Sequence, residues 1–246
     1  MRKIKNFFER FKSQYVDLFS VETYDYYKNL KDNIMFQNRL LYFPNGLKLL
    51  ENQSIYKKKE NILLHVARIG SFEKNSELLI KALNKIKPEI LKQWKIYLIG
   101  PYTVEFKKFL EEIQSENKLL KDIIFLTGNI SDRTLLYSYY AKSKIFCLTS
   151  RHESFGIAAL EALYHKNYLL LSNYGLVVND LTDNEHYGKV VDSFDSDVWA
   201  KEIEQAMLDE KITEKVKSAQ EFVLNEFSYE INIKRLLKKI ETIKKV

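Results

Sequence analysis

The chain has 246 residues, 46% of them hydrophobic, and a formal net charge of +6, which excludes a disordered chain and allows one core with an appended piece. Its single cysteine, Cys147, excludes an internal disulfide and fits a reducing compartment. The chain lacks a signal-peptide run at its start and any uncharged apolar stretch long enough to span a membrane, so we expect a cytoplasmic protein.

Residues 2–12 form a basic amphipathic stretch in which Phe7, Phe8 and Phe11 stand among lysines and arginines. Such a stretch either contacts a membrane surface or packs as a surface helix on its own domain, and the second arrangement is the commoner. The net positive charge is compatible with anionic ligands or with the inner face of a membrane, although a solvated basic face explains it as well. We expect no nucleic-acid partner.

Strand and helix signals follow in order. Asp17–Val21 is typical of a strand and Tyr24–Lys31 of a helix, while residues 47–60 are polar and lysine-rich, as expected of a connector.

Glycines then mark a repeated pattern of strand, turn and helix. Six of the seven glycines come a few residues after an apolar run. These runs are Leu40–Phe43, Ile62–Val66, Ile96–Ile99, Ile123–Leu126, Ile145–Leu148 and Tyr168–Leu171, followed by Gly46, Gly70, Gly100, Gly128, Gly156 and Gly175. The alternation predicts an α/β fold with a Rossmann-like, doubly wound parallel sheet, in which a ligand binds at the carboxyl ends of the strands.

Two cations flank the glycine turn after the run at 62–66. Arg68 ends the strand, and Lys74 comes six residues later, just before a predicted helix at Ser76–Ile86. Arginine binds phosphate through two hydrogen bonds and lysine acts as a point charge, so the pair is placed where a diphosphate would lie. The alternative is that these side chains pair with Glu73 or Glu77 at the surface.

The next segments are mostly scaffold. The run at Lys95–Gly100 and the helix predicted from Val104 to Asn117 carry no chemistry that we recognise. Ser131 and Asp132 are typical helix-capping residues for a helix at Arg133–Ala141. The tyrosines of that helix favour packing over a stacking platform.

The central motif lies at the next corner. The strand-like run Lys144–Thr149 leads into a loop with Glu153, then Gly156, and an alanine- and leucine-rich helix that contains Glu161. The free amides at a helix N-terminus favour a phosphate, and two carboxylates at the same place can bind hydroxyl groups. That combination suits a sugar nucleotide.

Glu153 and Glu161, spaced as Glu-x7-Glu with Ser-Phe-Gly-Ile between them, resemble the signature of the retaining glycosyltransferases of family 4. The resemblance covers about residues 15–243 and implies the C-terminal, nucleotide-sugar-binding half of a two-domain GT-B architecture. It implies transfer of a sugar from a UDP- or GDP-linked donor with retention at the anomeric carbon, in cell-surface polysaccharide or glycolipid synthesis. No cofactor is implied.

The resemblance also implies roles for individual residues. Arg68 and Lys74 would stabilise the leaving diphosphate, because fixed cations aimed at the developing charge are the expected source of catalysis. Glu153 would position the donor sugar as the third catalytic residue, together with the amides of Phe155, Gly156 and Ile157. The donor-binding set is completed by Ser154, by Glu161 on the ribose hydroxyls, and by Ile130 and Asp132 near the base; for Asp132 helix capping remains an equal alternative.

The resemblance divides the chain into three parts. Residues 1–45 match the end of an N-terminal domain and the hinge at Tyr42–Gly46, residues 46–210 match the donor-binding domain, and residues 211–246 match the terminal helices. Asp180–Asn184 and Tyr187–Val191 correspond to the final strand region. Most of the N-terminal domain, which normally holds the acceptor, has no counterpart here, so we expect preceding residues or a partner chain to supply it.

The histidines do not suggest a metal site. His65, His165 and His186 lack the paired spacing of a zinc site, and we interpret them as structural or solvated. His152 adjoins Glu153, where it either lines the site or fills the loop. Beside a donor-binding half of a glycosyltransferase, two alternatives stay open: a non-catalytic nucleotide-sugar-binding or regulatory module, and a basic interaction domain with a vestigial motif.

Overall fold

The computed structural model describes residues 15–36, 38–47 and 58–244. The basic stretch at 2–12 and most of the connector at 47–60 lie outside the described residues. The chain divides into two compact units, one made of Met1–Leu49 with Leu224–Val246 and the other of Leu50–Val223.

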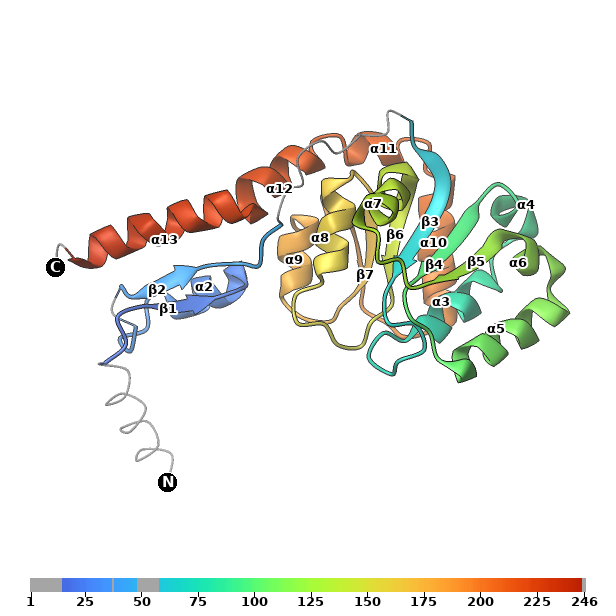
Figure 1. The fold of residues 1–246 in the computed structure, drawn as a ribbon, viewed down its shortest axis with the longest axis horizontal. Coiled ribbons are helices and arrows are strands. Elements are labelled where there is room, and N and C mark those ends of the chain that lie inside the picture. The colour runs from blue at the N-terminus through green and yellow to red at the C-terminus, as the bar shows by residue number, and fades with distance from the viewer. Residues whose placement is uncertain (1–14, 37, 48–57, 245–246) are drawn as a thin grey trace, which may run out of the picture. The chain divides into compact units, whose positions relative to one another are not determined.

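The larger unit contains a six-stranded, wholly parallel sheet within the described residues (Figure 1). Its strands, in the order in which they lie side by side, are β5 (Ile124–Gly128), β4 (Lys95–Ile99), β3 (Glu60–Val66), β6 (Ser143–Leu148), β7 (Tyr168–Ser172) and β8 (Gly188–Val191). The central strands β3, β6 and β7 are almost continuously buried, because helices cover both faces of the sheet. The predicted doubly wound α/β fold is therefore confirmed.

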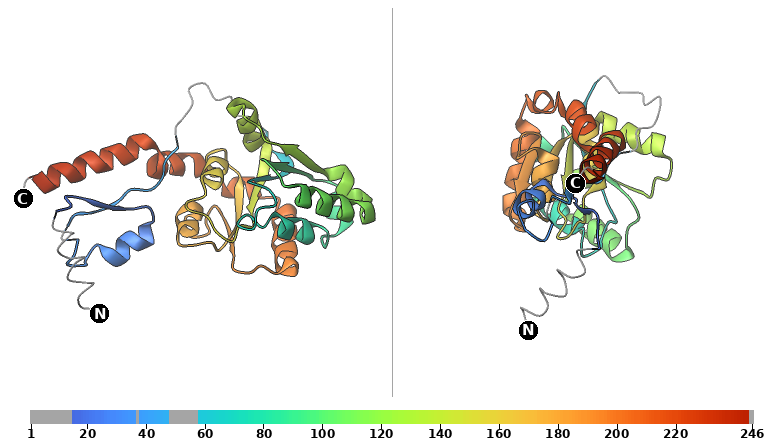
Figure 2. Two further views of the ribbon diagram at one scale, coloured as in Figure 1. Left: turned by 60° about the horizontal axis from the view of Figure 1, so that its bottom comes forward. Right: turned by 90° about the vertical axis from the view of Figure 1, so that its left-hand side faces the viewer.

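Helices form a layer on each side of this sheet (Figures 1 and 2). One layer consists of α3 (Ser76–Leu83), α4 (Pro88–Leu91), α5 (Val104–Glu116), α6 (Lys118–Ile123) and α10 (Ser196–Leu208). The other consists of α7 (Arg133–Lys142), α8 (Ile157–Tyr164) and α9 (Val177–Thr182). The short α11 (Ile212–Lys215) contacts β7. Trp199 of α10 and Phe106 of α5 are fully buried in the core of the first layer.

The smaller unit is built on two short parallel strands. β1 (Phe19–Val21) pairs with β2 (Leu40–Tyr42), and α2 (Tyr24–Leu30) connects them. The unit also contains the long helix α13 (Tyr229–Lys244), whose Asn232 Nδ2 donates a hydrogen bond of 2.8 Å to the carbonyl of Pro44. α12 (Ala219–Phe227) contains the boundary between the two units.

Some expected elements differ from the structure. The predicted strand at Leu40–Phe43 belongs to the small sheet and not to the main one. Ile123 ends a helix that the sequence pattern did not predict, α6, so the neighbouring strand begins at Ile124. The final strand is confined to β8, whereas Asp180–Thr182 lie in α9, where Val177, Val178 and Leu181 are buried at helical spacing.

Candidate functional site

The order of strands fixes where a ligand site belongs. β3 is followed along the chain by β4 and β5 on one side, and β6 by β7 and β8 on the other, so the winding reverses between β3 and β6. Ligands of such sheets bind at the carboxyl ends of the two strands that flank this reversal. Here the loops are residues 67–75 and 149–156, and they are joined, since the carbonyl of Glu73 accepts hydrogen bonds from the amides of Arg151 (2.7 Å) and His152 (3.4 Å).

Lys74 and Glu153 meet across these two loops. Lys74 Nζ lies 2.5 Å from Glu153 Oε1, and Ser150 Oγ donates a 3.0 Å hydrogen bond to the same oxygen. Both side chains are largely buried, with 15% and 10% of their surface exposed. The sequence placed these residues in one site with separate roles. The structure adds that their opposite charges are paired directly with each other.

Arg68 lies on the same loop as Lys74 and is exposed. Its charge reaches Glu73, whose pKa lies below its usual value, first because its own backbone donates a hydrogen bond to the carboxylate and further because Arg68 and Lys74 are near. The two cations therefore lie on one loop with an acidic residue between them.

The first turn of α8 presents backbone amides at the same edge. Gly156 precedes the helix with φ of 90°, in the left-handed region that favours glycine. A Cβ at this position would come within 2.6 Å of the hydroxyl of Tyr174. Phe155 is buried beneath the loop, whereas Ser154 and Ile157 are exposed. Of the predicted donor-binding residues in this corner, Phe155 and Gly156 are therefore buried, whereas Ser154 and Ile157 face solvent.

Glu161 is buried in α8 and pairs with Arg133, a residue that the sequence analysis did not select. Arg133 Nη2 contacts Glu161 Oε1 and donates a 2.6 Å hydrogen bond to the hydroxyl of Tyr137. Partial burial alone would lower the pKa of Arg133, but the bonds to Glu161 and Tyr137 raise it above its usual value. The sequence contained one sign of this pairing. Arg133 lies in the first turn of a helix, where a positive charge is unfavourable beside the positive end of the helix dipole and needs an acidic partner.

The loop after β5 brings the remaining predicted residues near α8. Asp132 caps α7, since its Oδ1 accepts hydrogen bonds from the amides of Thr134 (2.8 Å) and Leu135 (3.3 Å). The capping interpretation of Asp132 is thus confirmed. Ile130 is partly exposed in the same loop, and Arg133, which follows Asp132, connects this loop to Glu161.

The histidines have mostly structural contacts. His65 is fully buried, with Nδ1 2.8 Å from the carbonyl of Cys147 and Nε2 2.9 Å from Ser76 Oγ. Burial lowers its pKa to about 4. His152 is exposed beside Glu153. In the part of the chain that the structure describes, no three His, Cys, Asp or Glu side chains group as metal ligands would.

Comparison with known proteins identifies the family. The model for glycosyl transferases group 1 matches residues 48–222, which include both loops and both ion pairs described above. The chain belongs to this family. Among the described residues, no helix of this family member is both long and apolar enough to cross a membrane.

Three relatives illustrate the range of similarity. A Campylobacter jejuni enzyme named as a GalNAc-alpha-(1->4)-GalNAc-alpha-(1->3)-diNAcBac-PP-undecaprenol alpha-1,4-N-acetyl-D-galactosaminyltransferase is 26% identical over 153 residues, covering 62% of this chain and 40% of that one. A solved structure of Staphylococcus aureus TarM, with UDP bound, has a TM-score of 0.70 at 18% identity and covers 96% of this chain and 46% of its own.

The third is Anabaena HepE in complex with UDP, with a TM-score of 0.68 at 17% identity, covering 95% of this chain and 65% of that one. The structural likenesses establish the fold, which matches that of GT-B glycosyltransferases. The chain spans less than two thirds of the length of each of these three proteins.

Proposed function

We propose that this chain is the donor-binding half of a retaining glycosyltransferase of family 4 and that it binds a UDP- or GDP-linked sugar without a cofactor. The main support for the proposal is two ion pairs near the point where the winding of the sheet reverses: Lys74 with Glu153 and Arg133 with Glu161. They place cations and carboxylates beside the amides of α8, a set that complements both the diphosphate and the hydroxyl groups of such a donor. Family membership and the UDP bound to two relatives support it.

The leaving diphosphate is assigned to the loop of Arg68 and Lys74. A lysine ammonium has three N–H donors, so Lys74 can hold Glu153 with one and contact a phosphate with another. Fixed in this way before the substrate arrives, the cation needs no reorganisation when negative charge develops on the leaving group. Arg68, exposed on the same loop, adds a second charge.

Glu153 and Glu161 are assigned to the sugar and the ribose. Glu153 is held by Lys74 and Ser150, so its carboxylate is oriented before binding. Glu161 is buried and held by Arg133 in the same manner, and it would accept hydrogen bonds from the ribose hydroxyls. Ser154 and the amides of Phe155, Gly156 and Ile157 complete the donor site, with Ile130 and the loop of Asp132 beside the base.

The acceptor is assigned to an N-terminal α/β domain, supplied by preceding residues or by a partner chain. The small unit supports this, because a two-stranded sheet buries little core and α2 contains no buried residue. Tyr229, Ile233 and Leu237 recur every four residues along α13, each more than half exposed. The lipid-linked saccharide in the name of the Campylobacter jejuni relative supports a glycolipid or polysaccharide product made at the cytoplasmic face of a membrane.

Calorimetry on the purified chain tests the donor site. We expect UDP or GDP to bind, and Arg68→Ala to weaken the diphosphate by about tenfold or more while leaving the nucleoside almost unchanged, because only the diphosphate contacts that charge. Lys121→Ala is the matched control, since Lys121 is an exposed cation on α6, ahead of β5 and therefore at the opposite edge of the sheet. Equal losses for diphosphate and nucleoside would contradict the assignment.

A non-catalytic nucleotide-sugar-binding module is the second candidate. Such a module would bind the donor with the same two ion pairs, Lys74 with Glu153 and Arg133 with Glu161. The non-catalytic module would be supported if the chain binds the donor but no sugar is transferred even when an acceptor domain is supplied.

A further inference from the structure

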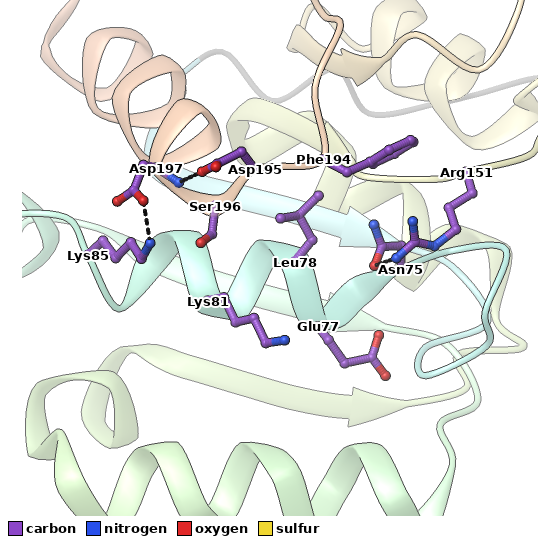
Figure 3. Close-up of a pocket in the computed structure, with 10 residues that line it drawn as sticks. All are labelled: Asn75, Glu77, Leu78, Lys81, Lys85, Arg151, Phe194, Asp195, Ser196 and Asp197. Carbon is purple, nitrogen blue, oxygen red and sulfur yellow. Dashed lines mark hydrogen bonds and ion pairs between the residues drawn. The ribbon is translucent and has the colours of Figure 1, made fainter.

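A groove of about 360 Å³ opens beside the donor site, between α3 and the start of α10. Figure 3 shows side chains of α3 along one wall, the segment from Phe194 to Asp197 along the other, and Arg151 with Asn75 at one end. The volume lies in the range of small-molecule sites. Neither Glu153 nor Glu161 lines the groove, so it is a separate site.

The groove is charged but balanced. Six of the residues that line it carry charge, three cations and three carboxylates: Lys81, Lys85, Arg151, Glu77, Asp195 and Asp197. Two of the carboxylates are engaged, because Asp197 pairs with Lys85 at 2.7 Å and Asp195 accepts a 2.6 Å hydrogen bond from the amide of Asp197. A balanced set of donors and acceptors favours a neutral, hydroxyl-rich ligand over a polyanion, which would need an excess of positive charge.

Two exposed aromatic rings lie at the Arg151 end. The guanidinium carbon of Arg151 lies 5.0 Å from the ring centres of both Phe72 and Phe194, so the three side chains form a stack. Phe72 is 72% exposed and Phe194 is 46% exposed. Large apolar rings held this open to solvent provide a flat surface for the C–H face of a sugar ring.

Asn75 gives an independent indication of a ligand. Its Oδ1 accepts a 3.0 Å hydrogen bond from Arg151 Nη2, but its Nδ2 is buried and has no hydrogen-bond partner among the described residues. The side chain is only 7% exposed and lines the groove. Buried donors are almost always satisfied, so this amide is accounted for by an acceptor that arrives with a ligand.

We propose that this groove binds a neutral saccharide of the glycan that receives the transferred sugar. The position supports the assignment, because Asn75 adjoins Lys74 and Arg151 shares a loop with Glu153, so the groove adjoins the donor site. The identity of the ligand as an acceptor saccharide rests on the proposed function. The donor-binding half would then hold part of the acceptor as well.

Saturation-transfer NMR on the intact chain tests the groove. The probes are the methyl α- and β-glycosides of glucose, galactose, N-acetylglucosamine and N-acetylgalactosamine. We expect at least one to bind, and Phe194→Ala to weaken it about five- to tenfold through loss of the ring face. Glu77→Ala, a partly exposed position on the other wall, should weaken it as well. Phe125→Ala is the matched control, because Phe125 is a similarly exposed ring on the edge strand β5.

Binding of no glycoside, or binding that is equal in Phe194→Ala, Glu77→Ala and the unaltered chain, would overturn the inference. A parallel titration with UDP and GDP separates it from the donor site. Nucleotide binding without glycoside binding would contradict saccharide binding in the groove and would leave the proposed donor-binding function intact. Glycoside binding that depends on Phe194, without nucleotide binding, would support the saccharide groove while contradicting the donor site.

Discussion

The buried carboxylate of Glu161 depends on Arg133 for its neutralising charge. The carboxylate of Glu161 is buried, and half of the Arg133 side chain is exposed. Arg133→Ala leaves that carboxylate without its cation, which we expect to cost about 1–2 kcal/mol after allowance for solvent on the arginine side. Denaturant unfolding of Arg133→Ala, Glu161→Gln and the double variant measures the coupling. The double variant should recover part of the loss, and strictly additive effects would contradict the pair.

His65 gives a pH dependence with a definite sign. Its pKa is about 4 in the folded chain because of burial, with further effects from Lys74 and Glu153, and the ordinary value is 6.5. The unfolded chain therefore takes up the proton first, so stability present above pH 6.5 is lost as the pH falls toward 4. The loss at this residue is up to about 3 kcal/mol.

His65→Gln keeps a donor and an acceptor but does not titrate. The difference in unfolding free energy between the two chains, measured from pH 7 to pH 4, isolates His65 because the other groups titrate in both. We expect the unaltered chain to lose stability relative to the variant on acidification. If the difference in unfolding free energy does not change with pH, His65 is not a buried neutral histidine.

The sequence could predict which residues lie near the site but not how they pair. Glu153, Lys74 and Glu161 were found because each has a fixed place after a strand or in a helix, and parallel strands bring those places to one edge. The contacts of Lys74 with Glu153 and of Arg133 with Glu161 join residues 79 and 28 positions apart. Such pairs depend on the order of strands, which no local pattern contains.

At the scale of elements, the start of α8 is the most constrained corner. Gly156 has a positive φ, and a Cβ there would meet the hydroxyl of Tyr174 at 2.6 Å. We expect Gly156→Ala to destabilise the chain by about 1–3 kcal/mol, from backbone strain together with this clash. Thermal or denaturant unfolding measures it.

Tyr174→Phe separates the two causes. The hydroxyl of Tyr174 is buried without a hydrogen-bond partner among the described residues, so removing it should cost almost nothing. When Tyr174→Phe is combined with Gly156→Ala, the steric clash should be relieved, and a loss of about 1 kcal/mol from backbone strain should remain. If Tyr174→Phe leaves the cost of Gly156→Ala unchanged, the hydroxyl is not the obstacle.

Long buried strands were predictable and short elements were not. β3, β6 and β7 are apolar on both faces, which gives continuous runs that the sequence displays directly. α6 has only six residues, and the resemblance assigned Asp180–Asn184, which overlaps the end of α9, to a strand region. The few apolar residues of so short a helix do not distinguish the helical period from the strand period. Tertiary packing decides such short segments.

At the scale of the whole molecule, donor binding and sugar transfer should separate. Effective transfer needs both substrates held in one geometry, and the acceptor is assigned mainly to a separate N-terminal domain. We expect the purified chain to bind a nucleotide sugar but to transfer almost nothing to an added saccharide acceptor, measured by release of free nucleotide diphosphate. Turnover at rates of about 1 per second or more, ordinary for enzymes, would contradict this division.

We propose that a nucleotide diphosphate binds between the carboxyl ends of β3 and β6. A crystal structure of the chain with UDP or GDP tests it most directly. We expect the diphosphate within hydrogen-bonding distance of Lys74 and the first amides of α8, and the ribose hydroxyls on Glu161. A nucleotide bound at any other edge of the sheet, with both ion pairs untouched, would contradict it.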